Sequence, residues 1–243
     1  PSLMLHAHLD TIPVGDCGLF RREGDIVYGR GASDMKGGFA AMLGAVKAVL
    51  DTGTRLSGDL WLTTVVGHEG TQAAKDGPRT LIGDIRSGDL ACDRILIGEG
   101  ENELWIMSLG SMVFTITLTS KRGGVHTTHV PFEKNPIRSV GEIIARATGF
   151  QKELDSAPPH PLAGHERIDI GMVRAGDYFN RTPVHSTITG TRRWSPGRNA
   201  AEILDELQTL FTPLAVLSES ECTVRMEHQR EPFEISSGDP IVQ

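Results

Sequence analysis

Apolar segments of strand length alternate with helical segments through the first 100 residues, and this order restricts the possible folds more than any other feature. Residues 58–67 are almost continuously apolar, which is typical of a parallel strand buried on both faces. Residues 35–53 carry Ala, Leu and Val at helical spacing and end at Gly53, a residue type common just after a helix. We therefore expect a layered α/β domain. Its strands are predicted over 2–9, 58–67 and 94–100, and its helices over 35–53 and 77–85.

The pattern changes near Leu109, where strands of alternating character replace the continuous apolar runs. Residues 111–120 alternate apolar side chains with Thr or Ser, the period of two that is typical of a half-exposed strand. Two amphipathic helices are expected between such strands, and the order β-α-β-β-α-β predicts a ferredoxin-like unit. The predicted strands are 111–120, 167–176, 186–194 and 222–228, and the predicted helices are 135–154 and 199–217.

Ionisable side chains gather where the first three predicted strands end, and in the Gly-rich turn after the first of them. This set comprises His8, Asp10, Asp34, His68, Glu69 and Glu99. The carboxyl ends of strands in an open α/β sheet lie at one edge, which is where ligands bind in such folds. We therefore expect these side chains to share one site.

Imidazole and carboxylate ligands without thiolates favour zinc, or a related divalent ion such as cobalt or manganese. His8 and Asp10 lie two positions apart on a strand, so both side chains point to the same face. His8 can then bind a metal while Asp10 accepts the proton on the other ring nitrogen, which fixes the tautomer. The spacing therefore favours His8 as a ligand and Asp10 as the residue that orients it.

Charge and hydropathy disfavour several other classes of function. The net charge of -7 disfavours a nucleic-acid partner, and no apolar run is long enough to cross a membrane. The Gly-rich turn at 29–38 lacks the Walker pattern and the dinucleotide fingerprint, which disfavours phosphate binding. Three widely separated cysteines favour a reduced, cytoplasmic setting.

With these residues in view, the chain resembles the zinc-dependent M20 peptidase family over almost its whole length. That family includes acetylornithine deacetylase, succinyl-diaminopimelate desuccinylase, aminoacylases and glutamate carboxypeptidases. The stretches HAHLDTIPVGD and YGRGASDMKGGFAAML resemble its first two metal motifs, and GEG stands where the family has Gly-Glu-Pro. The stretches GGVHTTHVPFEKNPI and GDYFNRTPVHSTITGTRRWSPG are similar to two motifs of the family's small domain.

The resemblance implies a zinc-peptidase catalytic domain of α/β class with an inserted ferredoxin-like α+β lid that mediates dimerisation. The implied boundaries are 1–109 for the first part of the catalytic domain, 110–229 for the lid and 230–243 for the return to the catalytic domain. The implied partners are a small N-acyl amino acid or dipeptide as substrate and a second copy of the chain in a homodimer.

The same resemblance implies two zinc ions at one site, with cobalt or manganese as alternatives. His8 and Glu99 would bind the first zinc, Glu69 would bind the second, and Asp34 would bridge the two. Asp10 would orient His8.

The resemblance also implies roles for residues of the small domain. His126 would reach the active site of a partner subunit and stabilise the oxyanion. Asn180 and Arg193 would contact the substrate, with Arg193 binding its carboxylate through the forked guanidinium. Arg192 is expected on the opposite face of the strand, in solvent.

The chain departs from the family at His68, which stands where the family has the Glu that serves as general base. A histidine can act as a base near neutral pH, and we assign His68 that catalytic role. Three alternatives remain open: His68 is an added ligand, the site is weakened, or Glu69 is the base in a shifted register.

The family's last metal-binding His has no counterpart here, because His228 lies too early, in the last predicted strand of the small domain. Pro1 stands directly in a strand pattern, so we expect a fragment that lacks both termini. The predicted function is hydrolysis of an amide bond in an N-acyl amino acid or short peptide by a metal-activated water. The alternative is a catalytically impaired homologue that acts as a binding or dimerisation protein.

Overall fold

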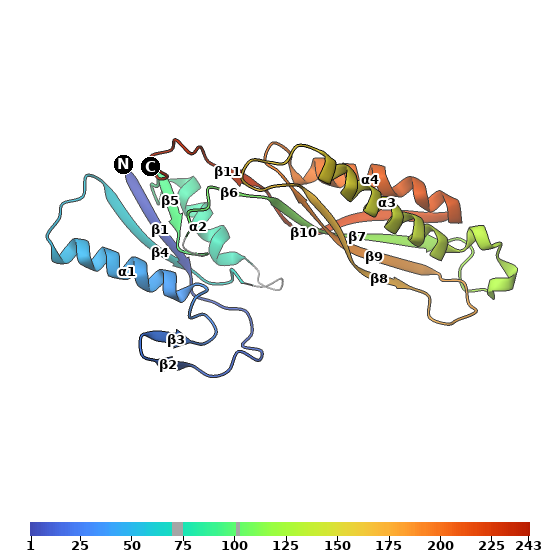
Figure 1. Ribbon diagram of the computed structural model, residues 1–243, viewed down its shortest axis with the longest axis horizontal. Helices are drawn as coiled ribbons and strands as arrows, with labels where there is room; N and C mark the ends of the chain where they lie inside the picture. Colours follow the sequence, from blue (N-terminus) through green and yellow to red (C-terminus); the bar gives the residue numbers. More distant parts are fainter. Residues whose placement is uncertain (70–74, 101–102) are drawn as a thin grey trace. The chain divides into compact units, whose positions relative to one another are not determined.

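The computed structural model describes residues 1–69, 75–100 and 103–243 (Figure 1). Two compact units are present, residues 1–104 and residues 105–243. Residues 230–243 group with the second unit. The predicted division at 109 and 229, with a return to a catalytic domain, therefore stays a prediction.

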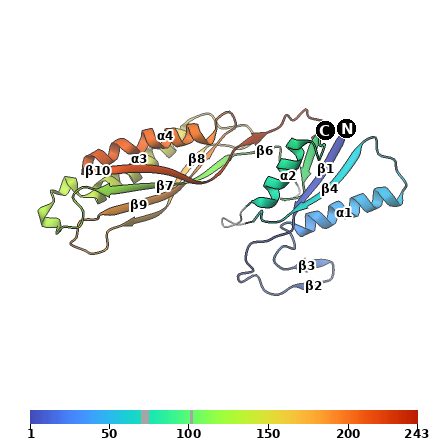
Figure 2. The same cartoon turned by 180° about the vertical axis from the view of Figure 1, so that it is seen from behind.

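A parallel three-stranded sheet of order β4-β1-β5 forms the centre of the first unit. Because β1 is the middle strand, its backbone is hydrogen-bonded on both sides. Helix α1 packs against β1 and helix α2 against β4, and β2 pairs with β3 in a small hairpin (Figures 1 and 2). The bounds are β1 Ser2–His8, β2 Arg21–Glu23, β3 Ile26–Tyr28, α1 Lys36–Asp51, β4 Asp59–Val65, α2 Asp76–Ser87 and β5 Arg94–Ile97.

Two glycines allow α1 to lie close to the end of β5. A Cβ on Gly38 would overlap the main-chain carbonyl of Gly98, and a Cβ on Gly98 would press on the side chain of Met42. Met42 is the buried residue of α1. The close approach places the first turn of α1, just after Asp34, beside the residue that precedes Glu99.

An antiparallel four-stranded sheet of order β10-β7-β9-β8 forms the second unit together with helices α3 and α4. The chain order is β7-α3-β8-β9-α4-β10, which is the predicted β-α-β-β-α-β order, and both helices cover one face of the sheet (Figures 1 and 2). The bounds are β6 Met107–Ser108, β7 Gly110–Ser120, α3 Pro136–Ser156, β8 Arg167–Ala175, β9 His185–Trp194, α4 Ala200–Ala215, β10 Ser220–Arg230 and β11 Phe233–Glu234. Three short 3-10 helices lie at Thr127–His129, Phe132–Lys134 and Val216–Ser218.

Local sequence signals explain where the two long helices begin. The side chain of Asn135 accepts a hydrogen bond from the backbone N–H of Ile137, and Pro136 follows in the first turn of α3. Asn199 and Glu202 form a reciprocal capping box at the start of α4. Apolar side chains then recur at helical spacing and pack on the sheet; in α4 the buried ones are Ala200, Ile203, Leu207, Phe211 and Ala215.

Arg192 is fully buried, so the expectation that it lies in solvent is wrong. Residues 192 and 193 do point to opposite faces of β9, but the face of Arg192 is the one covered by the helices. Its guanidinium is neutralised there by Glu166, with Nη2 and Oε2 2.6 Å apart, and by Glu206, with Nε and Oε1 3.0 Å apart. A buried charge needs such partners to be tolerated.

No helix in the described part of the chain is long and apolar enough to cross a bilayer.

Candidate metal centre

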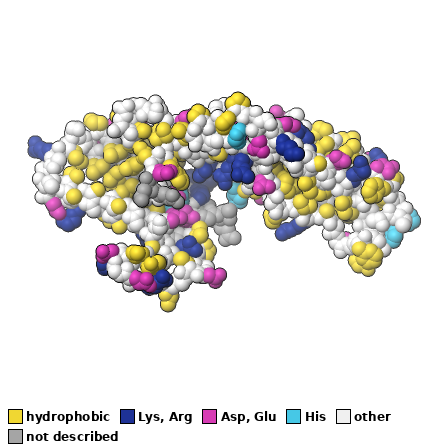
Figure 3. Space-filling view, in the orientation of Figure 1, with side chains coloured by type: hydrophobic (Ala, Val, Ile, Leu, Met, Phe, Trp, Pro, Cys, Tyr) yellow, Lys and Arg dark blue, Asp and Glu magenta, His cyan; other side chains and the backbone are white. Residues whose placement is uncertain are grey.

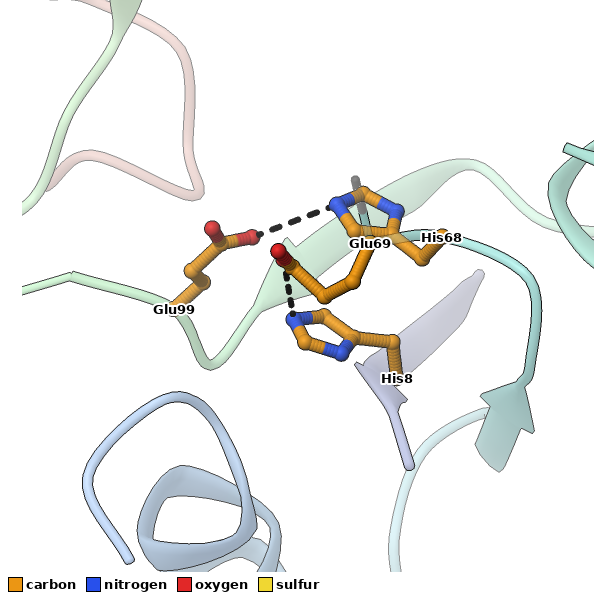
Figure 4. A group of neighbouring side chains, drawn as sticks. All are labelled: His8, His68, Glu69 and Glu99. Atoms are coloured by element: carbon orange, nitrogen blue, oxygen red, sulfur yellow. Dashed lines mark ion pairs between the residues drawn. The ribbon is translucent and has the colours of Figure 1, made fainter. Parts of the chain in front are cut away.

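Four side chains from three strand ends converge in the first unit (Figure 4). His8 is the last residue of β1, His68 and Glu69 follow β4, and Glu99 follows β5. Each of the four offers one ligand atom, and these atoms all lie within 4.8 Å of one another. The parallel register of β1 with β4 and β5 brings the strand ends to one edge of the sheet, as the sequence predicted.

The side chain of His8 is the most buried of the four in this cluster. Only 2% of the His8 side chain is exposed, and Nε2 lies 3.2 Å from Oδ1 of Asp34 and 3.4 Å from Oε1 of Glu69. Within the described residues, Nε2 is buried and has no hydrogen-bond partner. An unpaired polar atom of this kind is costly to bury. A divalent cation among these nitrogen and oxygen atoms would satisfy it, so the donor set fits a metal ion of the zinc type.

Asp10 contacts both His8 and Glu69, but in a different way from the one we predicted. The Nδ1 atom of His8 lies 2.9 Å from the backbone carbonyl oxygen of Asp10, whereas the nearest carboxylate oxygen is 3.7 Å away. The backbone carbonyl is therefore the closer acceptor for the ring proton. The Asp10 carboxylate accepts a 2.8 Å hydrogen bond from the backbone N–H of Glu69. Burial on its own would raise the pKa of Asp10, but hydrogen bonds from the backbone of Glu69 and His68 outweigh it and lower that pKa.

His68 lies inside the cluster rather than at its edge. Its ring stacks on that of His8, with centroids 4.5 Å apart and planes inclined by 8°. Its Nε2 atom is 3.9 Å from Oε2 of Glu99 (Figure 4), and the amine of Lys75 donates to its backbone carbonyl. This position suits a proton acceptor beside the metal ligands and also suits an added ligand, so both alternatives stay open.

Two residues near the cluster were missed by sequence reasoning. The buried Met35 accepts a hydrogen bond from the backbone N–H of His8 through its sulfur, at 3.1 Å, and so ties the turn of Asp34 to the end of β1. His6, which the sequence did not single out, is partly buried, and its Nδ1 atom lies 2.9 Å from the hydroxyl of Thr63. Burial, followed by the nearby charges of His68 and His8, lowers the pKa of His6. The alternation of β1 places His6 on the same face as His8, which was the available signal.

In the second unit, His126 and Asn180 lie together. The Nδ2 atom of Asn180 is 3.0 Å from Nε2 of His126 and can donate to it. His126 belongs to the loop after β7, and Asn180 belongs to the loop between β8 and β9, so both sit at the same end of the sheet. A second histidine, His129, lies three positions further on, with its ring centroid 6.1 Å from that of His126.

Arg193 lies at the other end of that sheet. It is exposed on β9, near the strand's last residue, whereas the loop of Asn180 precedes the first residue, His185. A strand rises about 3.3 Å per residue, so the span from position 185 to position 193 is about 26 Å. The structure therefore does not bring Arg193 to the pair formed by His126 and Asn180.

Sequence relatives and solved structures agree with this reading of the fold. The chain is 28% identical over 186 residues to a succinyl-diaminopimelate desuccinylase of Maricaulis maris, covering 70% of this chain and 46% of the relative. It is 29% identical over 174 residues to a succinyl-diaminopimelate desuccinylase of Rhodospirillum centenum, covering 66% of this chain and 43% of the relative. The chain thus spans about half the length of these curated relatives.

Two crystal structures share the fold at low sequence identity. An M20 family metallo-carboxypeptidase of Sulfolobus solfataricus superposes with a TM-score of 0.69 at 16% identity, over 99% of this chain and 67% of that one. The aminopeptidase PepT of Bacillus cereus superposes with a TM-score of 0.71 at 15% identity, over 99% of this chain and 61% of that one. The predicted α/β fold class is confirmed. The family model of peptidase family M20/M25/M40 matches residues 4–243, and the chain belongs to that family.

Proposed function

We propose that the protein containing this chain hydrolyses an amide bond in an N-acyl amino acid or a short peptide, by means of a metal-activated water. The observation that carries the proposal is that His8, His68, Glu69 and Glu99 offer ligand atoms within 4.8 Å of one another, with Nε2 of His8 buried and without a hydrogen-bond partner within the described residues. The relatives named as desuccinylases, whose name describes removal of an acyl group, support the reaction class.

The ligands of the metal would be His8, Asp34, Glu69 and Glu99, with zinc as the ion, two per site, and cobalt or manganese as alternatives. A divalent ion held by these residues would supply a water of lowered pKa and would polarise the scissile carbonyl. Asp34 is 62% exposed and lies 3.2 Å from Nε2 of His8, and it would be the ligand shared by the two ions, as the resemblance implies. The Asp10 carboxylate would position Glu69 through the backbone N–H of that residue, and the Asp10 carbonyl would hold the tautomer of His8.

The proton of the attacking water would go to His68 and from there to the leaving amine. The imidazole is partly exposed, so a substrate can reach it, and it lies beside Glu99, which keeps it near the ligands. In the alternative register, Glu69 would act as the base in place of His68, and the second metal would lack one ligand.

We propose further that the active protein is a homodimer in which each site uses two chains. His126, paired with Asn180, would stabilise the oxyanion, and Arg193 would bind the substrate carboxylate. Since Arg193 and that pair lie about 26 Å apart along β9, one small substrate cannot touch both within a single chain. Two chains related by a twofold axis would supply one group each. A cytoplasmic location fits the three cysteines, all of which are free.

Metal content and amidase activity of the complete protein test the proposal. We expect more than one zinc per chain and an amidase activity that is lost in a chelator and recovered with zinc. In His8→Ala, we expect both the zinc content and the activity to be lost. The matched control is His165→Ala, because His165 is exposed and lies outside the cluster. Fewer than one metal per chain, with amidase activity intact in the chelator, would contradict the proposal.

The second candidate function, a catalytically impaired homologue that binds amino-acid derivatives or serves in dimerisation, is favoured by one observation. By the resemblance of its motifs, His68 would stand where the family has the general-base Glu. Metal binding without turnover in the wild type, together with turnover in His68→Glu, would favour this candidate.

A further inference from the structure

Two aromatic side chains stand exposed in the loop between β8 and β9. Tyr178 is 59% exposed and Phe179 is 86% exposed, and their rings lie 4.6 Å apart between centroids. Figure 3 shows hydrophobic side chains gathered over this loop, at the lower right of the view. Adjacent aromatic rings left in water mark a binding surface more often than isolated apolar residues do.

An ion pair and a backbone hydrogen bond span the turn that carries these rings. Nε and Nη2 of Arg181 donate to the two carboxylate oxygens of Asp177, at 3.0 and 2.6 Å, so an ion pair closes the turn. The backbone N–H of Arg181 also donates to the carbonyl of Tyr178. A binding group that is already ordered loses less conformational entropy when a ligand arrives.

A hydrogen bond ties the same turn to the loop of His126. The backbone N–H of Thr127 donates to the carbonyl of Asn180 at 2.9 Å, and the side chains of Asn180 and His126 pair at 3.0 Å. The aromatic pair therefore directly precedes the residue that contacts the proposed oxyanion donor.

A cavity of about 470 Å³ adjoins the aromatic pair. Its size falls in the range of about 300–1,000 Å³ that is typical of small-molecule sites. Asp177 and Arg181 are its charged groups and they neutralise each other, so the cavity favours an uncharged ligand. Its other walls include Thr127, Ile137, Ala175, Tyr178, Phe179 and Pro183.

We propose that Tyr178, Phe179 and this cavity form a specificity subsite for an apolar acyl group of the substrate. The inference rests on the proposed function. Arg193, at the far end of β9, is the proposed partner of the substrate carboxylate. The loop of Tyr178 and Phe179 would therefore contact the other end of the substrate, which is the acyl group. An apolar acyl group would bury the exposed ring faces, whereas a succinyl group would bring a carboxylate next to Asp177 without a free cation to receive it.

The test compares three substrates that differ only in the acyl group: N-acetyl-, N-succinyl- and N-benzoyl-L-alanine. We expect the complete wild-type protein to prefer N-benzoyl over N-succinyl substrate. In Phe179→Ala and in Tyr178→Ala, the ratio of kcat/KM for N-benzoyl to that for N-acetyl substrate should fall by about tenfold, mainly through KM. Phe132→Ala is the matched control, since Phe132 is 77% exposed in the same unit but outside the cavity lining; it should leave the ratio unchanged.

An unchanged ratio in both variants would overturn the inference. An equal loss for all three substrates, with a change in oligomeric mass, would also overturn it and assign the rings to an interface between copies. If the wild type hydrolyses none of the three, these N-acyl alanines are not its substrates, and the proposed function is tested separately by metal content and by activity on short peptides. Calorimetry with N-benzoyl-L-alanine then decides the inference: weaker binding by Phe179→Ala supports it, and equal binding overturns it.

Discussion

The imidazole rings of His8 and His68 lie face to face, with centroids 4.5 Å apart and planes inclined by only 8°. One ring belongs to the central strand and is buried, while the other belongs to the segment after β4 and is partly exposed. This difference in solvent access fits two different roles. The buried His8 would be a metal ligand, and the partly exposed His68 would be the base that exchanges protons with the substrate.

Substitutions of His68 distinguish its possible role as general base from its possible role as metal ligand. If His68 is the base, His68→Ala should lower kcat by about 10²- to 10⁴-fold, because general-base catalysis contributes that much. The metal content should stay at the wild-type value. His68→Glu should retain more activity than His68→Ala, since it restores a proton acceptor. A His68→Ala protein that loses one metal per chain would show instead that His68 is a ligand.

Asp10 should control the metal affinity through Glu69. Asp10→Ala removes the acceptor for the backbone N–H of Glu69, and we expect metal affinity to fall by about 10- to 100-fold, as for other residues that orient ligands. Asp10→Asn keeps an oxygen acceptor, so the metal affinity of this variant should fall less. Competition with a chromogenic chelator measures both. Equal affinity in Asp10→Ala and wild type would contradict the assigned role.

Two glycines of α1 should respond in opposite directions to the same substitution. Gly38→Ala would overlap the carbonyl of Gly98, and we expect a loss of about 1–3 kcal/mol in the free energy of unfolding. Gly44→Ala meets no atom within 4 Å and should stabilise the helix by up to about 1 kcal/mol. Thermal unfolding measures both variants. A Gly38→Ala protein as stable as Gly44→Ala would show that α1 does not depend on its close approach to Gly98.

Adjacent arginines on β9 should differ in what they affect. Arg192→Met leaves Glu166 and Glu206 without their buried cation, and removal of one partner of a buried ion pair costs about 3–5 kcal/mol. Arg193→Met changes an exposed side chain and should leave stability nearly unchanged while raising KM for substrates with a free carboxylate. Denaturant unfolding and steady-state kinetics separate the two effects. Equal unfolding midpoints for the two variants would contradict the burial of Arg192.

The fold of the first unit was predictable from the sequence, because the spacing of apolar residues identifies its strands and helices and the ionisable residues lie at the ends of its strands. Continuous apolar runs identified the parallel strands, and the positions of His8, Glu69 and Glu99 at or near the ends of these strands predicted one shared edge. The sequence could not predict which oxygen of Asp10 meets His8, since the backbone and side-chain acceptors of one residue differ only by local torsion angles.

In the second unit, alternation predicted the strands but not which face the helices cover. Arg192 and Arg193 were correctly placed on opposite faces, yet the buried one was assigned to solvent because its partners, Glu166 and Glu206, come from distant segments. The sequence did not predict a role for Tyr178 and Phe179, for a different reason. They lie in a turn with no periodic pattern, and their significance comes from a cavity that only the folded chain forms.

The central place of β1 has a consequence for how this centre can change over time. The central strand β1 pairs with β4 and β5, and His8 itself pairs with Val65 of β4, whereas positions 68, 69 and 99 lie on segments that follow strands β4 and β5. We therefore expect the position of His8 to vary less than the positions of the other three donors. Attempts to re-engineer the preference for one cation over another should begin with those three positions and leave His8 untouched.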